Sequence, residues 1–481
     1  MLAHLKKWFV LYLLLIIVLY LVIGATAPFV RYKKLSAETV QAADAVVADI
    51  LSGEGVSVDR AMLLESNTQA LDERIRLLNM AKERIILSTF DMREGESSDD
   101  LAAMLLQKAD EGVQVALLID GFNGSFRLPG QDFFYAMSTH PNIEIRIYNP
   151  INLLTPWTSQ GRMHDKYVIV DDLAYILGGR NSFDYFLGDY DCENRSLDRE
   201  VLIYNTEKGT ENRESSLWQV ESYFEKVWDG GYCKVFGEKE ELATKQSVQD
   251  ERERLAARYE QLVTQNPELF APYDYTESTY ATESVTLLSG ETGIYGKEPA
   301  VLYQLKELMK QAEERVLIHT PYAVCNDYMY QVLREVNEAA PETVMMLNSV
   351  ENGDNFCASS DYMRNKQDIL DTGITLYEYD GGDSYHGKSI VIDDDISIIG
   401  SYNFDLRSTY MDTELMLVVK SKELNAELTA NMESFESQCR RVISASDYEV
   451  PEDVSVAEIP FLKKAAMQVF GFVIQGFRYL L

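Results

Sequence analysis

The chain has 481 residues and a hydrophobic fraction of 46%, which favours a globular protein with about two domains and excludes a single ordinary core. Its formal net charge of -33 would repel phosphate backbones, so we expect no nucleic-acid partner. The five cysteines lack CxxC spacing and a His/Cys cluster, so we expect no metal site, no disulfide framework and no cofactor.

The first predicted element is an apolar helix. Residues 8–30 carry no charge over 23 positions, enough at about 1.5 Å rise per residue to cross a hydrocarbon core of roughly 30 Å. Residues 25–27 resemble a signal-peptide cleavage site, but Pro28 would follow the cut directly, and the apolar run is long for a signal peptide. We therefore favour an uncleaved membrane anchor over residues 1–34. Basic residues flank both of its ends and leave its orientation open.

Helix and strand patterns then alternate in two similar halves. A helical spacer at 35–57 precedes a first lobe at 58–236, and the same order of patterns returns in a second lobe at 286–445. Between the lobes, residues 237–285 are charged and helix-prone, and we interpret them as a helical connector or an arm packed on one lobe. This alternation predicts an α/β fold with an internal repeat.

The C-terminal segment, 446–481, is also apolar toward its end. Its uncharged core has only 13 residues between Lys464 and Arg478, which is too short to span a membrane. Two interpretations remain open, a helix lying in the membrane interface and an ordinary helix docked on a domain.

The two halves carry the same polar residues at the same spacing. The segments are GRMHDKYVIVDDLAYILGGRN, residues 161–181, and YHGKSIVIDDDISIIGSYN, residues 385–403. A single HxK pair is more often a strand end with two solvated polar residues, but two copies in register favour a functional site. Five pairs stand 222 positions apart, namely His164 and His386, Lys166 and Lys388, Asp171 and Asp393, Gly178 and Gly400, and Asn181 and Asn403.

This residue set suits a phosphoryl group. Side chains two positions apart on a strand share a face, so each histidine projects beside its lysine while the branched residues pack into the sheet. Bringing the halves together would surround one point with two imidazoles, two ammonium groups and two carboxamides. Cations and N–H donors would stabilise the equatorial oxygens, and imidazoles on opposite sides would serve in-line attack and departure.

Both segments resemble the signature HxKxxxxDxxxxxxGSxxN of the phospholipase D superfamily. The neighbouring sequences RMHDKYVIVDD, GGRNSFDYF and GSYNFDLRS look most like its bacterial cardiolipin synthase branch, and the resemblance covers roughly residues 58–440. It implies two phospholipase D-like lobes, each a mixed β-sheet flanked by helices, with the active site at the lobe interface.

The resemblance also implies a two-step phosphotransfer without metal. One histidine attacks phosphorus to form a phosphohistidine, and the other protonates the leaving alcohol and then activates the incoming alcohol or water. By analogy His164 is the nucleophile and His386 the acid/base, and the likeness of the halves leaves the reverse order open. Four residues would grip the phosphate: Lys166, Asn181, Lys388 and Asn403.

Further carboxylates would support these groups. Asp171 and Asp393 would hold the motif loops rather than touch substrate. A neutral imidazole nucleophile needs an acceptor for its other nitrogen, and the candidates are Glu200 in LDREVLIY and Glu414 in TYMDTELMLVV. Each of these two could instead be an exposed carboxylate at a strand edge. The family commonly has Asn where this chain has Asp412.

The predicted function is that of a cell-membrane phosphatidyltransferase of cardiolipin synthase type. It would move a phosphatidyl group between phospholipids, with phosphatidylglycerol and also phosphatidylethanolamine as expected substrates. The rival enzymatic hypothesis is a phospholipase D that passes the intermediate to water and yields phosphatidic acid. A nuclease-type phosphodiesterase fits the anchor and the acidic surface less well, and a non-catalytic membrane scaffold fits the intact signature positions less well.

Overall fold

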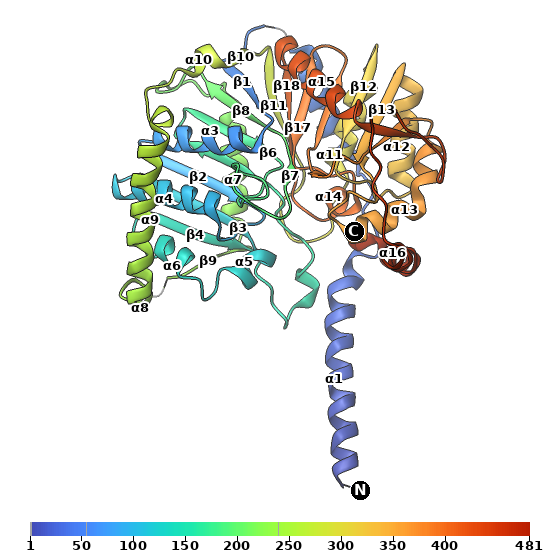
Figure 1. The fold of residues 1–481 in the computed structure, drawn as a ribbon, viewed down its shortest axis with the longest axis horizontal. Coiled ribbons are helices and arrows are strands. Elements are labelled where there is room, and N and C mark those ends of the chain that lie inside the picture. The colour runs from blue at the N-terminus through green and yellow to red at the C-terminus, as the bar shows by residue number, and fades with distance from the viewer. Residues whose placement is uncertain (1, 54, 239) are drawn as a thin grey trace.

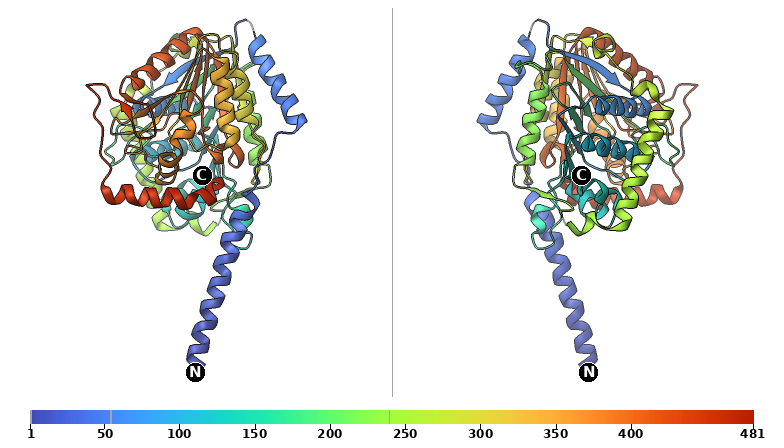
Figure 2. Two further views of the ribbon diagram at one scale, coloured as in Figure 1. Left: turned by 90° about the vertical axis from the view of Figure 1, so that its right-hand side faces the viewer. Right: turned by 90° about the vertical axis from the view of Figure 1, so that its left-hand side faces the viewer.

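Two lobes and one protruding helix make up the protein (Figure 1). The structure is a computed structural model and describes residues 2–53, 55–238 and 240–481. Helix α1 (Leu2–Thr26) extends away from the lobes (Figures 1 and 2), and the short 3-10 helix η1 (Ala27–Phe29) joins it to them, with Phe29 buried in the core of the second lobe. Each lobe is built on a nine-stranded mixed sheet, which confirms the expected fold of two α/β lobes.

The first lobe contains a parallel centre with antiparallel strands on both sides. Strands β2, β3 and β4 are parallel neighbours, and β5 pairs with β2 antiparallel. The spatial order is β10 (Tyr280–Ala281), β1 (Asp59–Leu64), β8 (Glu200–Asn205), β6 (Ala174–Gly178), β5 (Tyr167–Val170), β2 (Arg84–Thr89), β3 (Gln114–Asp120), β4 (Ile143–Tyr148) and β9 (Cys233–Val235). Its helices are α3 (Asn67–Asn79), α4 (Glu96–Asp110), α5 (Gly121–Arg127), α6 (Asp132–Ser138), η2 (Pro156–Thr158) and α7 (Leu217–Trp228).

The second lobe repeats this order. In spatial order across the sheet, the strands from β11 to β19 have the same positions and directions as the strands from β1 to β9 in the first sheet. The spatial order is β11 (Ser284–Ser289), β18 (Leu415–Lys420), β17 (Ile396–Gly400), β16 (Ser389–Ile392), β12 (Arg315–His319), β13 (Glu342–Asn348), β14 (Thr375–Tyr379), β19 (Cys439–Val442) and β20 (Tyr448–Glu449). Its helices are α11 (Ala300–Met309), α12 (Asp327–Ala339), α13 (Phe356–Leu370), α14 (Leu406–Tyr410), α15 (Lys422–Glu436), α16 (Phe461–Val473) and η4 (Ile474–Leu480).

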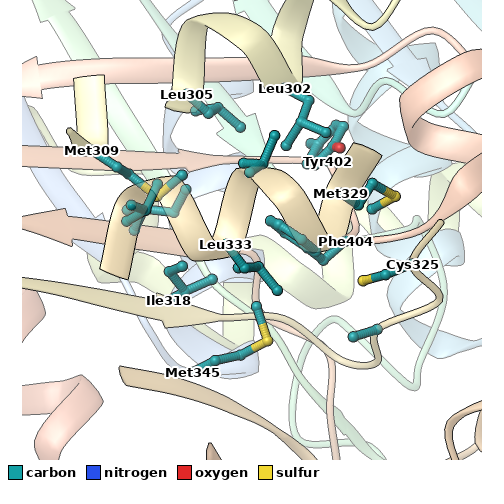
Figure 3. Packing of buried hydrophobic residues seen from close by; sticks show 14 of the residues in the cluster. Leu302, Leu305, Met309, Ile318, Cys325, Met329, Leu333, Met345, Tyr402 and Phe404 are labelled. Carbon is teal, nitrogen blue, oxygen red and sulfur yellow. The ribbon is translucent and has the colours of Figure 1, made fainter. Parts of the chain in front are cut away.

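Both faces of each sheet are buried, which explains why the strands read as continuous apolar runs. On β5, Val168 packs under the helices of its own lobe, whereas Ile169 belongs to a core shared with the second lobe. In the second lobe, α11 and α12 cover the outer face of β12 and β13, where Leu305, Leu333 and Ile318 pack together (Figure 3). A small parallel ladder of β7 (Ser196–Leu197) and β15 (Ser384–Tyr385) also joins the lobes.

The two segments expected to link domains are both packed on a lobe. Helix α2 (Ala37–Ser52) lies within the predicted spacer, and its Val47 and Ile50 pack into the core of the second lobe beside α11. Between the lobes run α8 (Glu240–Ala243), α9 (Gln246–Gln265), η3 (Pro267–Leu269) and α10 (Tyr275–Ser278). Helix α9 contacts α4 and α6, so this segment is an arm on the first lobe.

Candidate active site

The two motif histidines lie where the lobes meet. His164 and His386 each stand just before the inner strands β5 and β16, and their side chains are 13% and 12% exposed. The backbone N–H of His164 donates to the carbonyl of Thr413 at 3.3 Å, and that of His386 donates to the carbonyl of Leu197 at 2.6 Å. Each motif is therefore fixed by a segment of the opposite lobe.

Each histidine also faces a carboxylate from the opposite lobe. Nδ1 of His164 lies 3.0 Å from Oε1 of Glu414, whose oxygens accept hydrogen bonds from Ser401 and Ser408. Nδ1 of His386 lies 2.6 Å from Oδ2 of Asp198. The carboxylates fix the orientation of both rings, so that Nε2 is the nitrogen left for chemistry.

Glu200 is not placed as expected. Arg74 donates two hydrogen bonds of 2.6 and 2.7 Å to the buried carboxylate of Glu200. The Glu200 side chain therefore stabilises the first lobe and contacts neither histidine. The expectation that Glu200 orients a histidine was therefore wrong, and Asp198, two residues earlier, does so.

The strand register relates Asp198 to Glu414. Gly178 pairs with Glu200 in the first sheet, and the equivalent Gly400 pairs with Met416 in the second. Asp198 and Glu414 both stand two residues before these pairing partners. In the sequence, Asp198 and Glu200 are two acidic residues beside the same predicted strand, and the register that selects Asp198 comes from the structure.

The two motif lysines are buried beside the histidines. Burial lowers the pKa of Lys166 to about 7, although Glu414 opposes the shift. Burial likewise lowers the pKa of Lys388, whose Nζ lies 2.5 Å from Nδ1 of His386 and 3.6 Å from Asp198. Two ammonium groups this poorly hydrated bind an anion more strongly than exposed lysines would.

Burial sets the protonation of the histidine pairs. The pKa of His164 falls well below 6.5 through burial and the nearby Lys166 and Lys388, so its imidazole is neutral at physiological pH. Burial raises the pKa of Glu414 to about 8. Burial alone would also raise the pKa of Asp198, but Lys388 and His386 outweigh it and hold that pKa below its usual range.

The asparagines of the motif have unused capacity for hydrogen bonds. Within the described part of the chain, Oδ1 of Asn181 and Oδ1 of Asn403 are buried and have no partner. Asn181 lines a polar cavity of about 560 Å³ together with His386, Arg93 and Arg195. Its lining also includes the acidic residues Asp91, Glu193, Asp354 and Asp383, so the cavity is a polar space of mixed charge beside His386.

Asp171 and Asp393 hold the motif turns. Both have positive φ, 51° and 50°, at the turn after the first motif strand. Asp171 accepts backbone N–H bonds of 2.8 to 2.9 Å from residues 82–84, and Asp393 accepts equivalent bonds of 2.8 to 3.0 Å from residues 313–315. These contacts fit the supporting role expected of both carboxylates. In residues 2–53, 55–238 and 240–481, no cluster of three or more His, Cys, Asp or Glu side chains could hold a metal ion.

The chain matches one protein family in both lobes. The family described as "Cardiolipin synthase, PLD-like domain", where PLD stands for phospholipase D, matches residues 75–228 and 305–435. Each matched segment contains one copy of the doubled motif.

Full-length relatives and one solved structure agree with this match. Cardiolipin synthase C of Escherichia coli (strain K12) is 26% identical over 410 residues, covering 75% of this chain and 81% of the relative. The major cardiolipin synthase ClsA of Bacillus subtilis (strain 168) is 25% identical over 355 residues, covering 72% and 63%. The crystal structure of phosphatidylserine synthase from Haemophilus influenzae Rd KW20 shares the fold, with a TM-score of 0.65, 16% identity and coverage of 92% and 100%. Because the matched segments make up more than half of the sequence, the chain belongs to the cardiolipin synthase family of phospholipase D-like proteins.

Proposed function

We propose that the protein is a membrane-bound cardiolipin synthase that transfers a phosphatidyl group from one phosphatidylglycerol to another. The observation that carries this proposal is the pair of histidines at the lobe interface, each held by a carboxylate of the opposite lobe beside a buried lysine. Phospholipids are proposed as substrates because the relatives are named cardiolipin synthases. Phosphatidylethanolamine is a second candidate donor.

In the first step, Nε2 of His164 attacks phosphorus. The bond to the headgroup oxygen breaks, a phosphohistidine forms, and His386 gives a proton to the departing glycerol. The low pKa of His164 supports its role as nucleophile, because a protonated ring has no free electron pair. Burial and Lys388 lower the pKa of His386 as well, and the ionised Asp198 opposes that shift. This carboxylate supports the role of His386 as acid, because it stabilises the imidazolium form.

In the second step, His386 accepts a proton from the hydroxyl of the second phosphatidylglycerol. The resulting oxygen attacks phosphorus, the P–N bond to His164 breaks, and cardiolipin leaves. Lys166, Lys388, Asn181 and Asn403 would bind the phosphoryl oxygens in both steps. Attack by water in place of the lipid hydroxyl would yield phosphatidic acid.

The site lies near the helix that we propose as the membrane anchor. The apolar segment Lys6–Phe29 is 24 residues long, and most of its large apolar side chains are exposed. The basic residues Arg31, Lys33 and Lys34 follow it directly and suit anionic headgroups. Anchoring would keep the acceptor lipid at high local concentration, which favours transfer over hydrolysis.

Helix α16 provides a second membrane contact in this proposal. It lies across the axis of α1 at the level where α1 meets the lobes (Figure 2). Met467 and Gly471 are buried, with Gly471 against Ser360 of α13, so the helix is docked on the second lobe. Its outer surface remains apolar and exposed, with Phe461, Leu462, Val469, Phe472 and Val473. This combination is typical of a helix in the plane of the interface.

Turnover of labelled phosphatidylglycerol by detergent-purified protein tests the function. We expect cardiolipin and glycerol, and H164A and H386A should abolish both. Phosphatidic acid as the main product would favour the hydrolase, and addition of phosphatidylethanolamine would identify the donor. A native protein that produces neither lipid would refute the proposal.

A further inference from the structure

An apolar cavity of about 450 Å³ lies between α1 and the first lobe. Most of its apolar lining comes from three parts of the chain that are distant in sequence. These are α1, the α5 region and the segment before the first motif, through Leu21, Ala25, Phe122, Phe126, Ile151, Leu153 and Pro156. The inner end of the cavity reaches Phe90.

Helix α1 forms one wall of this cavity and packs closely against the loop on the opposite side. Leu21, Gly24 and Ala25 are half-buried, whereas Val22 and Ile23 between them are exposed. The hydroxyl of Tyr20 donates to the carbonyl of Leu154 at 2.7 Å. A Cβ atom at position 24 would come within 2.5 Å of the Pro156 side chain, so glycine there permits the close approach of helix and loop.

The inner end of the cavity adjoins the candidate active site. The ring of Phe90 lies 5.2 Å from the ring of His164 and 5.5 Å from Nζ of Lys166. Phe90 also lines the polar cavity that contains Asn181 and His386. A single aromatic side chain therefore borders both the apolar cavity and the polar one.

Both arginines that line the inner end are paired with carboxylates of the protein. Arg407 forms a 2.9 Å ion pair with Asp412. Arg162 lies 3.6 Å from Asp120 and donates to the carbonyl of Asn149 at 2.9 Å, while its Nη1 makes no hydrogen bond within the described residues. A charged headgroup would have to displace these contacts, whereas a hydrocarbon chain would not. The free surface that remains is apolar, with Phe122, Phe126 and Leu153 exposed at its outer side.

We propose that this cavity binds an acyl chain of the phospholipid substrate, and that α1 guides the chain from the bilayer toward His164. The inference rests on the proposed function for the identity of the lipid. Leu21 and Ala25 lie within the segment Lys6–Phe29, which is long and apolar enough to span a membrane, so in the proposed anchoring the cavity opens at the depth of acyl chains. Each methylene group that moves from water into contact with the apolar walls lowers the free energy of binding. The polar cavity beyond Phe90 then holds the phosphodiester.

Filling the cavity should reduce turnover of long-chain lipids selectively. We expect A25W to lower the ratio of kcat/KM for dioleoyl- over dihexanoyl-phosphatidylglycerol about tenfold, since several methylene groups lose their apolar contacts. The matched control is I23W, which adds the same side chain to the exposed side of α1 and should leave the ratio unchanged. An unchanged ratio in A25W, or an equal fall in I23W, would overturn the proposal.

Photolabelling gives a readout that does not depend on turnover. Phosphatidylglycerol with a diazirine near the end of one acyl chain should label residues 149–160 and 121–127 in native full-length protein, and A25W should reduce this labelling severalfold. Label confined to the exposed surface of α1 would overturn the acyl site. Native protein that is labelled in the cavity but makes neither cardiolipin nor phosphatidic acid would refute the proposed function and leave the acyl site supported.

Discussion

Nδ1 of His386 lies 2.6 Å from Oδ2 of Asp198, across the boundary between the two lobes. The pair His164 and Glu414 crosses the same boundary in the opposite direction, at 3.0 Å. Each lobe therefore contributes one histidine and the carboxylate that orients the histidine of the other. Neither lobe contains a complete pair, so separation of the lobes would disable both histidines together.

This crossed arrangement predicts different effects for two neighbouring carboxylates. D198N should lower kcat about 10²- to 10⁴-fold, because the amide no longer fixes the ring of His386 in the working tautomer. E200Q should leave kcat within a few-fold of native and lower the melting temperature, because the buried Arg74 loses its ionic partner. Steady-state kinetics and thermal melting separate the two. A kcat for E200Q as low as that for D198N, at an unchanged melting temperature, would contradict the assignment.

The order of the histidines predicts which variant accumulates a covalent intermediate. With a phosphatidyl donor that carries nitrophenol as leaving group, H386A should still form phosphohistidine, since nitrophenolate departs without a proton. H164A should form none. Rapid quenching and mass spectrometry of the labelled peptide give the site. Label on His386 in the H164A variant would reverse the two roles.

The buried lysine predicts an alkaline limit of activity. In the proposed mechanism the ammonium form of Lys166 binds phosphate. Burial lowers the pKa of Lys166 to about 7, so the cation is lost as pH rises through this value. We expect kcat/KM of native protein to fall above about pH 7. K166R should shift this fall to higher pH, because arginine stays protonated, even if its rate is lower. K422R, at an exposed position, is the control. A profile for K166R with the native midpoint would exclude Lys166 as the titrating group.

The turn carboxylates predict a loss of stability instead of chemistry. D393A removes an acceptor for three backbone N–H groups and should lower the free energy of unfolding by about 2 kcal/mol or more. D394A removes a neighbouring carboxylate that forms only an exposed ion pair with Lys422, and should change stability by less than ~1 kcal/mol. Denaturant titration compares them, and equal losses would show that the N–H contacts of Asp393 contribute little.

The exposed face of α16 predicts a dependence on the membrane surface. F472E should raise KM for phosphatidylglycerol in vesicles severalfold and change KM in detergent micelles less, because a charge opposes burial of the helix in the interface. F472L keeps the apolar surface and should behave like native protein. Equal kinetics of F472E and native protein on vesicles would show that α16 does not contact the bilayer.

The sequence by itself predicted the fold class and the motif residues of the site, because the signals for both are local or repeated. The HxK spacing put each histidine and lysine at one strand end, and continuous apolar runs such as Tyr167–Val170 indicated strands buried on both faces. The fixed interval of 222 residues paired the two motifs and indicated a two-lobed fold. The uncharged run at residues 8–30 likewise predicted a membrane anchor from its length and composition.

The tertiary structure decided which groups meet, since that depends on how two repeated lobes are related in space. Glu414 lies in the same half of the sequence as His386, yet its carboxylate faces His164. Asp198 was missed because Glu200 offers the same charge two residues away, and only packing shows that Arg74 already binds it. The contact of Ala25 with the apolar cavity has no pattern in the sequence, because the helix and the loop that form its walls are more than 100 residues apart.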